Sequence, residues 1–405
     1  MSSANLEHRE VSAPRVSKFN VYIQGDLKHC HFTILTVHDL GCNHNSWRNF
    51  LEHESMKHIT NRAAFIHVDV PGQEDGAPDL PPEEESTSAI SNIGRRLSMG
   101  TERKGSFREQ TEECYTFPSM QSLGEDLICV LDQLDVKNVV GLGEGAGANI
   151  IARFAMSHPK RVLGICLVHC TGTTAGFMES LKDKVIGWKL DHIGMNPTAE
   201  AYLVLHRFGS KHLKDSNKRF EKAENKEELN KVLTTFQDGL RSKLNPHNLN
   251  RYVQSFMKRT CITDTIQKIT CPVLMVTGDK ASFNHTVHHL YGYMSQKLDK
   301  AKIELLEVEG VANVLEEKPQ KLAESFLYFC QGIGVVGGVP MPRVERTSSV
   351  DSDSARAALR NRSMSMEEAD LPKGTYSTSP TRPSGTKIEG TVSASEVKVD
   401  LVEKE

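Results

Sequence analysis

Short apolar runs alternate with amphipathic segments over most of the chain, and this alternation predicts its fold. The runs that read as strands end at charged, Gly or Pro positions; they lie within residues 17–38 and at 63–70, 138–143, 162–170, 271–279 and 301–310. The continuous apolar run at 162–170 is typical of a strand buried on both faces of a parallel sheet. The pattern therefore predicts a mostly parallel central sheet.

Helical spacing appears between these strands. In the segment 119–134 the apolar residues recur at three- and four-residue intervals: Leu123, Leu127, Val130, Leu131 and Leu134. The segment 318–334 is also amphipathic and ends at Gly332 and Gly334, as helices commonly do. Strands that alternate with helices favour an α/β fold whose helices flank the sheet.

Composition separates a core from polar segments. Residues 1–15 are polar and are expected to form a flexible N-terminus. Residues 83–113 are rich in charge, Ser and Gly, which predicts a disordered loop insertion, and 337–405 form a Ser/Arg-rich tail that lacks core residues. We expect one domain over 16–336, in which the charged block 177–260 is helical.

Charge and apolar content exclude several classes of function. The net charge of −3 gives no support for binding to nucleic acid. No apolar stretch is long enough to cross a membrane, and the first residues lack the apolar region of a signal peptide. The nine cysteines include no C-x-x-C pair, so we expect reduced thiols and a cytoplasmic location.

The segment 138–155 (NVVGLGEGAGANIIARFA) joins an apolar strand, a glycine-rich turn and an alanine-rich helix. This order is typical of the nucleophile elbow of α/β-hydrolases, in which G-x-S-x-G places Ser on a strained corner. In the frame GLGEG the nucleophile position is Gly143, which has no side chain to attack with. Shifting the frame to GEGAG places Gly145 at the apex, again without a side chain.

The glycine run has other interpretations. Glu144 is a candidate carboxylate nucleophile, but the residues two positions away are Leu142 and Ala146 instead of glycines. The run also fits G-x-G-x-x-A of a dinucleotide fold, which needs an acidic residue at the end of the next strand; that strand ends LVHCTG. The segment 285–290 (HTVHHL) has no Cys or carboxylate at metal-ligand spacing. We therefore expect neither cofactor nor metal.

The other two members of a hydrolase triad are also replaced. The acid normally follows the penultimate strand as G-x-x-D, where this chain has Ala281; Asp279 lies two residues earlier and is interpreted as a turn residue. The histidine normally follows the last strand, where this chain has Asn313, which cannot act as a general base near neutral pH. Three simultaneous replacements predict that the chain is not an enzyme.

The turn that would form the oxyanion hole is better preserved. His38, Asp39 and Gly41 resemble the turn after the third strand of a hydrolase. An acidic residue there would repel an incoming oxyanion. The alternative interpretation is that His38 and Asp39 only close the turn through hydrogen bonds.

These features together resemble the N-myc downstream-regulated (NDR) family. The resemblance covers roughly residues 16–336 and rests on the strand order, the HDLG turn, HVDVPGQEDGAP, VVGLGEGAGANI, the helical block, CPVLMVTGD and the closing helix. It implies an α/β-hydrolase fold with 177–260 as a helical cap, and a non-enzymatic protein. It also implies roles in signalling, stress response, growth control and differentiation, and a cytoplasmic protein that in some members associates peripherally with membranes.

Candidate phosphorylation sites lie in the polar segments. Ser365 follows Arg360 and Arg362 in the pattern R-x-R-x-x-S, and basic residues also precede Ser349 and Ser98. Basophilic Ser/Thr kinases bind such arginines through acidic pockets. The family resemblance likewise implies phosphorylation of the tail.

The sequence thus predicts a signalling or adaptor protein that binds protein partners through its cap and tail and does not bind nucleic acid. Two alternatives remain: a divergent, weak hydrolase that uses an unrecognised side chain, and a small-molecule sensor that binds a ligand in the inactive pocket. The sensor would be stabilised by its ligand. The sequence does not identify a partner.

Overall fold

One sheet of eight strands organises the molecule, in the order β1-β2-β4-β3-β5-β6-β7-β8. The strands are β1 (Glu7–Ala13), β2 (Ser17–Gln24), β3 (Phe32–Val37), β4 (Ala63–Asp69), β5 (Val139–Glu144), β6 (Val162–Val168), β7 (Val273–Gly278) and β8 (Ile303–Val308). The β1–β2 and β2–β4 pairs are antiparallel, and the other neighbours are parallel. The prediction of a mostly parallel sheet is confirmed.

The computed structural model describes residues 6–82, 115–173, 195, 197–209 and 226–337. All of them belong to the unit Met1–Val339. The predicted insertion 83–113, the residues of the predicted tail after 337, and the candidate phosphorylation sites Ser98, Ser349 and Ser365 lie outside the described residues.

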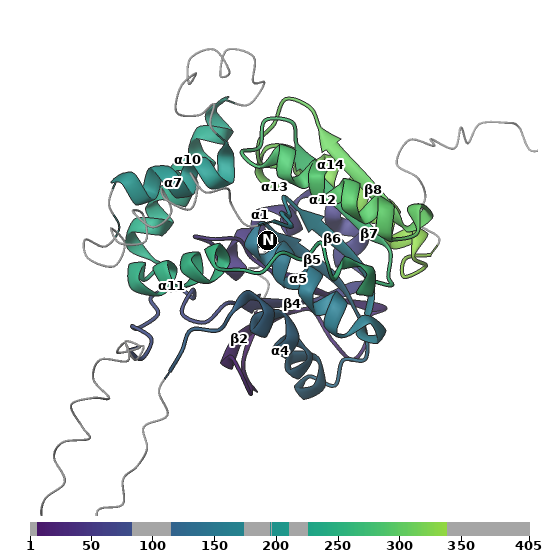
Figure 1. Cartoon of the computed structure of the whole chain (residues 1–405), viewed down its shortest axis with the longest axis horizontal. Coiled ribbons are helices and arrows are strands. Elements are labelled where there is room, and N and C mark those ends of the chain that lie inside the picture. Colours follow the sequence, from purple (N-terminus) through teal and green to yellow (C-terminus); the bar gives the residue numbers. More distant parts are fainter. Residues whose placement is uncertain (1–5, 83–114, 174–194, 196, 210–225, 338–405) are drawn as a thin grey trace, which may run out of the picture. The chain divides into compact units, whose positions relative to one another are not determined.

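Helices connect the strands and cover both faces of the sheet (Figure 1). They are α1 (Arg48–Glu52), α2 (Lys57–Thr60), α4 (Met120–Gln133), α5 (Ala146–Ser157), α7 (Pro197–Phe208), α10 (Lys226–Ser242), α11 (Pro246–Met257), α12 (Asn284–Lys297), α13 (Val314–Glu317) and α14 (Pro319–Gly332). The predicted helices at 119–134 and 318–334 are therefore present.

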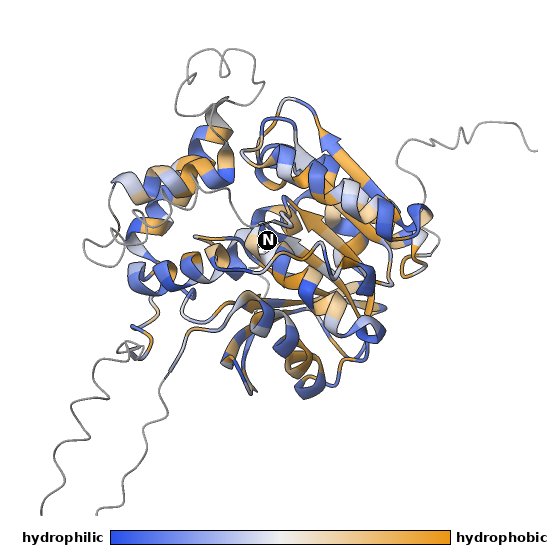
Figure 2. Ribbon diagram, viewed as in Figure 1, coloured by the Kyte–Doolittle hydropathy of each residue, from blue (hydrophilic) through white to orange (hydrophobic). Residues whose placement is uncertain are grey.

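Alternation along the strands builds two cores. Leu35, Val37 and Leu167 belong to the apolar cluster that packs under α4, α5 and α12. Ile34 and Val168, on the opposite face, belong to a second cluster with α1, α2, α13 and α14. Because the central strands are buried on both faces, they are apolar throughout, as Figure 2 shows, whereas most helices carry one polar face.

The N-terminal prediction was wrong in part. Residues 7–13 form β1 instead of a flexible segment, paired with β2 from Glu7 opposite Ile23 to Ala13 opposite Ser17. The strand lies at the edge of the sheet, where only Val11 and Ala13 are buried. An edge strand with a charged exposed face has a weak apolar signal.

The described parts of the block 177–260 are mainly helical: α7, α10 and α11 (Figure 1). Leu203 of α7, Leu240 of α10 and Leu249 of α11 are fully buried and join the core cluster on the α5 side of the sheet. These helices therefore pack onto the sheet domain, and α7 carries the side chains that enter the site at the end of β5.

Candidate functional site

The connection between β5 and α5 has the geometry of a nucleophile elbow. Gly145 lies between the strand and the helix with φ 52° and ψ −112°, a conformation that strains any residue with a Cβ. In G-x-S-x-G the serine occupies this corner. The frame of the motif is therefore Gly143-Glu144-Gly145-Ala146-Gly147, and the nucleophile position is Gly145.

The prediction that Gly143 occupies the apex was wrong by two residues. Gly143 lies within β5, paired with Val37 and Leu167 in the neighbouring strands. A Cβ at Gly143 would lie 2.6 Å from the Cα of Ala148, and a Cβ at Gly147 would lie 2.1 Å from the carbonyl oxygen of Val37. These two glycines allow α5 to pack closely against β3 and β5.

The space beside Gly145 is filled by a carboxylate. A Cβ at Gly145 would lie 2.1 Å from Oδ1 of Asp39, which follows β3 and is 3% exposed. The same oxygen accepts a hydrogen bond of 2.8 Å from the backbone N–H of Ala146. In active α/β-hydrolases the N–H of the residue after the nucleophile helps to bind the oxyanion. Here the carboxylate of Asp39 already accepts the hydrogen bond of that N–H.

A histidine from the cap completes this arrangement. Nε2 of His206, on α7, lies 3.3 Å from Oδ1 and 3.2 Å from Oδ2 of Asp39. Burial alone would raise the pKa of Asp39, but His206 and the Ala146 N–H outweigh it and lower that pKa to about 2. Asp39 is therefore a charged, paired carboxylate at neutral pH.

The rest of the predicted oxyanion turn has a structural role. Nε2 of buried His38 accepts a hydrogen bond from the N–H of Val70, so Nδ1 carries the proton and donates to the Asp39 carbonyl oxygen. Burial lowers the pKa of His38, which keeps the ring neutral. Gly41 has φ 72°, and a Cβ there would lie 2.9 Å from Leu240 of α10. His38 thus closes the turn through hydrogen bonds, whereas Asp39 also contacts the Ala146 N–H and His206 and does more than close the turn.

A second buried ion pair lies beside the first. Glu144 is 1% exposed; its Oε2 accepts a hydrogen bond of 2.8 Å from Nη1 of Arg207, and its Oε1 accepts one of 2.7 Å from Asn313. Nη2 of Arg207 donates to Glu316 at 2.8 Å, and Nη1 also contacts the sulfur of Cys42 at 2.9 Å. Arg207 thus joins the cap helix α7 to β5 and α13.

The electrostatics of this pair follow from burial and proximity. Burial raises the pKa of Glu144, while the neighbouring Arg207 acts in the opposite direction. Burial alone would lower the pKa of Arg207, but the surrounding thiol and carboxylates hold it well above its usual value. Because both carboxylate oxygens of Glu144 accept hydrogen bonds, we assign the pair as ionised.

The remaining predicted positions lie at the same site. Asn313 caps α13, since its side chain accepts a hydrogen bond from the N–H of Glu316. Ala281 follows β7 and lines the cavity. Asp279 accepts a hydrogen bond of 2.7 Å from the N–H of Gly310, as expected of a turn residue. The loops that follow β5, β7 and β8, which the sequence pattern assigned to the three triad positions, therefore meet at this site.

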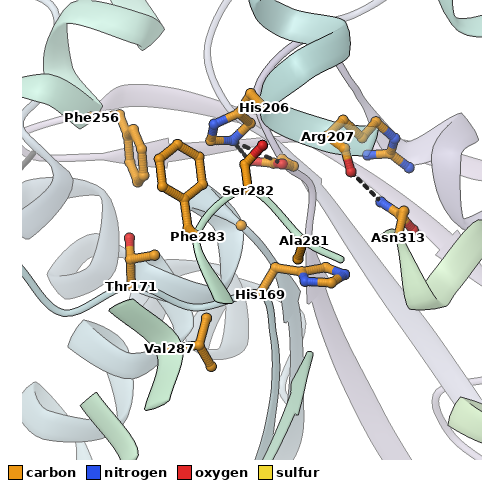
Figure 3. Close-up of a pocket in the computed structure, with 12 residues that line it drawn as sticks. His169, Thr171, His206, Arg207, Phe256, Ala281, Ser282, Phe283, Val287 and Asn313 are labelled. Atoms are coloured by element: carbon orange, nitrogen blue, oxygen red, sulfur yellow. Dashed lines mark hydrogen bonds and ion pairs between the residues drawn. The ribbon is translucent and has the colours of Figure 1, made fainter. Parts of the chain in front are cut away.

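The cavity at the centre of these residues is small (Figure 3). Its volume is about 20 Å³, which leaves room for about one water molecule. The side chains around it come from the ends of β3 and β6, from α7, α11 and α12, and from the loops after β7 and β8: Asp39, His169, Thr171, His206, Phe256, Ala281, Ser282, Phe283, Val287 and Asn313.

His169, at the end of β6, was missed at the sequence level. It has φ 54°, an uncommon conformation for a residue with a side chain, and its ring lines the cavity (Figure 3). Nε2 accepts a hydrogen bond from the N–H of Val314, and burial lowers the pKa of His169 to about 4. The ring is therefore neutral, with its proton on Nδ1.

The hydroxyl groups at the cavity are engaged elsewhere. Ser282 donates to the carbonyl oxygen of Leu205 at 2.6 Å, and Thr171 accepts a hydrogen bond from Arg259 at 2.9 Å. Neither hydroxyl has His169 or His206 as a hydrogen-bond partner in the described part of the chain. The site thus lacks the hydroxyl–imidazole pair that activates a serine nucleophile.

No cluster of three or more His, Cys, Asp or Glu side chains in the described ranges has a geometry that could hold a metal ion. Among the helices described, none has the length and apolar character to span a membrane.

Several solved structures that resemble this fold are hydrolases. An esterase from Thermogutta terrifontis aligns with 81% of this chain and 99% of its own, with a TM-score of 0.58 and 10% identity. The enol-lactonase from Burkholderia xenovorans aligns with 80% of this chain and 100% of its own, with a TM-score of 0.55 and 12% identity. At this identity the likeness establishes the α/β-hydrolase fold alone.

Sequence relatives are much closer. The protein ZK1073.1 of Caenorhabditis elegans is 39% identical over 376 residues, which cover 92% of this chain and 98% of the relative. Protein NDRG1 of Xenopus tropicalis is 31% identical, covering 80% of this chain and 71% of NDRG1. Human protein NDRG2 is 28% identical, covering 88% and 84%.

The model of the Ndr family matches residues 10–101 and 106–337, which include every strand of the sheet except the first residues of β1. This match and the relatives named NDRG1 and NDRG2 agree with the resemblance seen in the sequence. The chain therefore belongs to the Ndr family and has the α/β-hydrolase fold.

Proposed function

We propose that this Ndr-family chain is a non-catalytic signalling or adaptor protein. The observation that carries the proposal is the carboxylate of Asp39, which occupies the elbow where an enzyme has its nucleophile and accepts the hydrogen bond of Ala146 N–H. A negative charge there opposes the oxyanion that forms in acyl transfer. His206 and Arg207 hold this arrangement from the cap.

The alternatives receive less support. A weak hydrolase needs an activated nucleophile, whereas the hydroxyls of Ser282 and Thr171 are bonded away from the histidines. A sensor needs room for its ligand, whereas the cavity has space for about one water molecule. Either function would require Asp39 and the cap to move.

The cap suits a fixed recognition surface. Arg207 and His206 tie α7 to the sheet domain through buried ion pairs. The neighbouring helix α10 exposes polar side chains, among them Lys231 and Asp238, and Lys243, directly after the helix, is also exposed. We propose that protein partners bind this face, because charged side chains give specificity without destabilising the fold.

The tail supplies regulation in this proposal. Phosphorylation of Ser365 or Ser349 in the tail, or of Ser98 in the insertion, by a basophilic Ser/Thr kinase would add about −1.5 to −2 charges per site. We place the protein in the cytoplasm, with peripheral attachment to membranes, as the family resemblance implies. Substituting Arg360 and Arg362 by Ala should abolish phosphate at Ser365, measured by mass spectrometry; unchanged phosphate there would contradict this assignment.

A covalent probe tests the non-catalytic part. The full chain is incubated with a fluorophosphonate, which reacts with activated serines, and its intact mass is measured. We expect no adduct. An adduct that disappears when bulk is placed in the cavity by Ala281→Trp would show an activated hydroxyl at the site and overturn the proposal.

Charge reversal tests the adaptor part. Lys231→Glu with Lys243→Glu should remove the captured partners in a cross-linking experiment and leave the melting temperature unchanged, because both residues are exposed. Lys300→Glu, on the sheet domain, is the matched control and should leave capture intact. Equal capture by the cap variant and the control would contradict recognition through α10.

A further inference from the structure

Two buried arginines beside the cap have no acidic partner in the part of the chain that the structure describes. Arg153, on α5, is 2% exposed, and Arg259, which follows α11, is 6% exposed. The adjacent residue Thr260 accepts hydrogen bonds from Arg153, so the two side chains belong to one cluster. This cluster takes no part in the ion pairs around Asp39 and Glu144.

Arg153 is surrounded by neutral acceptors. Its guanidinium donates to Oδ1 of Asn149 at 2.8 Å and to Oε1 of Gln121 at 2.6 Å. It also donates to the hydroxyl of Thr260 at 3.1 Å and to its carbonyl oxygen at 2.5 Å. These bonds fix the side chain but leave its charge uncompensated.

Arg259 also donates to neutral acceptors, and one of its N–H groups has no partner among the described residues. It donates to the carbonyl oxygens of Phe256 and Thr173 and to the hydroxyl of Thr171. The guanidinium carbon lies 3.8 Å from the centre of the Phe256 ring. Its Nε is buried and has no hydrogen-bond partner within the described ranges. A buried donor without a partner is uncommon and indicates a missing ligand or water.

Both arginines of the cluster are protonated at neutral pH. Burial lowers the pKa of both Arg153 and Arg259, but only to about 10, so both stay protonated. The neighbouring thiol of Cys170 does not compensate them, because burial raises its pKa to about 12 and keeps it neutral. No carboxylate in the described residues accepts a hydrogen bond from either arginine.

The same molecule shows how a buried arginine is usually accommodated. Arg207 is as deeply buried, and it pairs with the carboxylates of Glu144 and Glu316 at 2.8 Å. Burying a charge without such a partner is costly. The contrast shows that Arg153 and Arg259, unlike Arg207, have no counter-charge among the residues that the structure describes.

We propose that Arg153 and Arg259 bind a phosphate group, either as inorganic phosphate or as the end of a small phosphomonoester. Two guanidinium charges match the charge of about −2 on a phosphate, whereas a carboxylate would neutralise only one of them. The free Nε of Arg259 supplies a donor for it. The site joins α5, the end of β6 and α11, so a bound phosphate stabilises the attachment of the cap.

Calorimetric titration of the full chain with inorganic phosphate, at constant ionic strength, tests the proposal. We expect saturable binding that Arg259→Gln weakens about 10- to 100-fold, since a hydrogen bond to a charged group contributes on this scale. Glycerol phosphate forms the second arm. Tighter binding of glycerol phosphate than of inorganic phosphate assigns a phosphomonoester, and the reverse order assigns the free ion.

The controls separate this site from general charge effects. Arg251→Gln removes a half-buried arginine on α11 that, within the described ranges, donates a side-chain hydrogen bond to the carbonyl oxygen of Pro81 alone, and it should leave binding unchanged. Circular dichroism establishes that Arg259→Gln is folded; if it is not, Arg153→Gln takes its place. An absence of saturable binding, or equal binding by the wild type and the folded variant, would overturn the proposal. The test does not depend on whether the protein is an enzyme.

Discussion

Two buried clusters of charged side chains meet at the end of β6, and they differ in whether carboxylates and basic groups are paired. His169 belongs to the elbow cluster, in which Asp39 pairs with His206, and Glu144 with Arg207. Two residues later, Thr171 belongs to the arginine cluster, in which no carboxylate of the described residues pairs with the guanidinium groups. The elbow cluster is thus compensated by the chain's own carboxylates and basic side chains, whereas the arginine cluster keeps uncompensated positive charge among the described residues. This difference favours the arginine cluster over the elbow as the place for the proposed phosphate.

Breaking the Arg207 ion pair should have the largest effect. Arg207→Ala leaves Glu144 buried and unpaired, so we expect a loss of about 3–5 kcal/mol in the free energy of unfolding. Urea denaturation measures it. Adding Glu144→Gln, which removes the stranded charge, should restore part of the loss. A cost below about 1 kcal/mol for Arg207→Ala, as is typical of exposed pairs, would contradict the role of this pair.

Adding a side chain at the elbow should have the next largest effect. Gly145→Ala combines a strained φ with overlap against Asp39, and we expect a loss of roughly 2–4 kcal/mol. Gly76→Ala is the matched control, because Gly76 has φ 71° with nothing within 4 Å of the added Cβ. Asp39→Gly should relieve most of the difference between the two variants. Equal losses at Gly145 and Gly76 would show that Asp39 does not fill the elbow.

Lowering the pH should reduce the free energy of unfolding, because Asp39 of the elbow cluster becomes protonated. The pKa of Asp39 is about 2 in the folded chain, below its ordinary value of 3.8, so the unfolded chain binds the proton first as the pH falls. The stabilisation is complete above about pH 4 and is lost between pH 4 and 2, by roughly 2 kcal/mol. Asp39→Asn should flatten the stability curve in that window. An unchanged acid slope in this variant would contradict the paired state of Asp39.

The turn at Asp279 should have the smallest effect of these. Asp279→Ala removes the hydrogen bond donated by the N–H of Gly310 and the partly exposed ion pair with Lys280, and we expect a loss of about 1 kcal/mol. Thermal denaturation measures it. A loss as large as that of Arg207→Ala would mean that Asp279 belongs to the elbow cluster and not to an isolated turn.

Much of the fold was predictable because the central strands are buried on both faces. The runs at 63–70 and 162–170 are apolar except at His67, Asp69 and His169, and such nearly continuous apolar character is typical of a buried parallel sheet. The edge strand β1 buries only Val11 and Ala13, so nothing in its composition separated it from a flexible terminus.

The register of the elbow was harder to predict for a different reason. The spacing of glycines is the same in GLGEG and GEGAG, so the pattern alone does not decide which glycine adopts a positive φ. The decision depends on where β5 ends, and the structure ends it at Glu144. The loops that carry Ala281 and Asn313 were located because each follows a clear strand.

No local sequence pattern predicted the residues that pair with Asp39 and Glu144. His206 is 167 residues from Asp39 in the sequence, and Arg207 is 63 residues from Glu144. Both lie in a helix with ordinary amphipathic spacing. Only packing of the cap onto the sheet domain brings them to the site, and single-sequence patterns do not encode such long-range pairs.

The most direct test of the account is hydrolysis of short-chain nitrophenyl esters by the full chain. Steady-state rates are compared with those of Ala281→Trp, whose indole blocks the cavity that Ala281 lines. The carboxylate of Asp39 accepts the hydrogen bond of the Ala146 N–H, which an enzyme would use to bind the oxyanion. We therefore predict that the wild type and Ala281→Trp hydrolyse the esters at the same background rate. Turnover by the wild type that Ala281→Trp abolishes would show that chemistry persists at the elbow and would contradict the account.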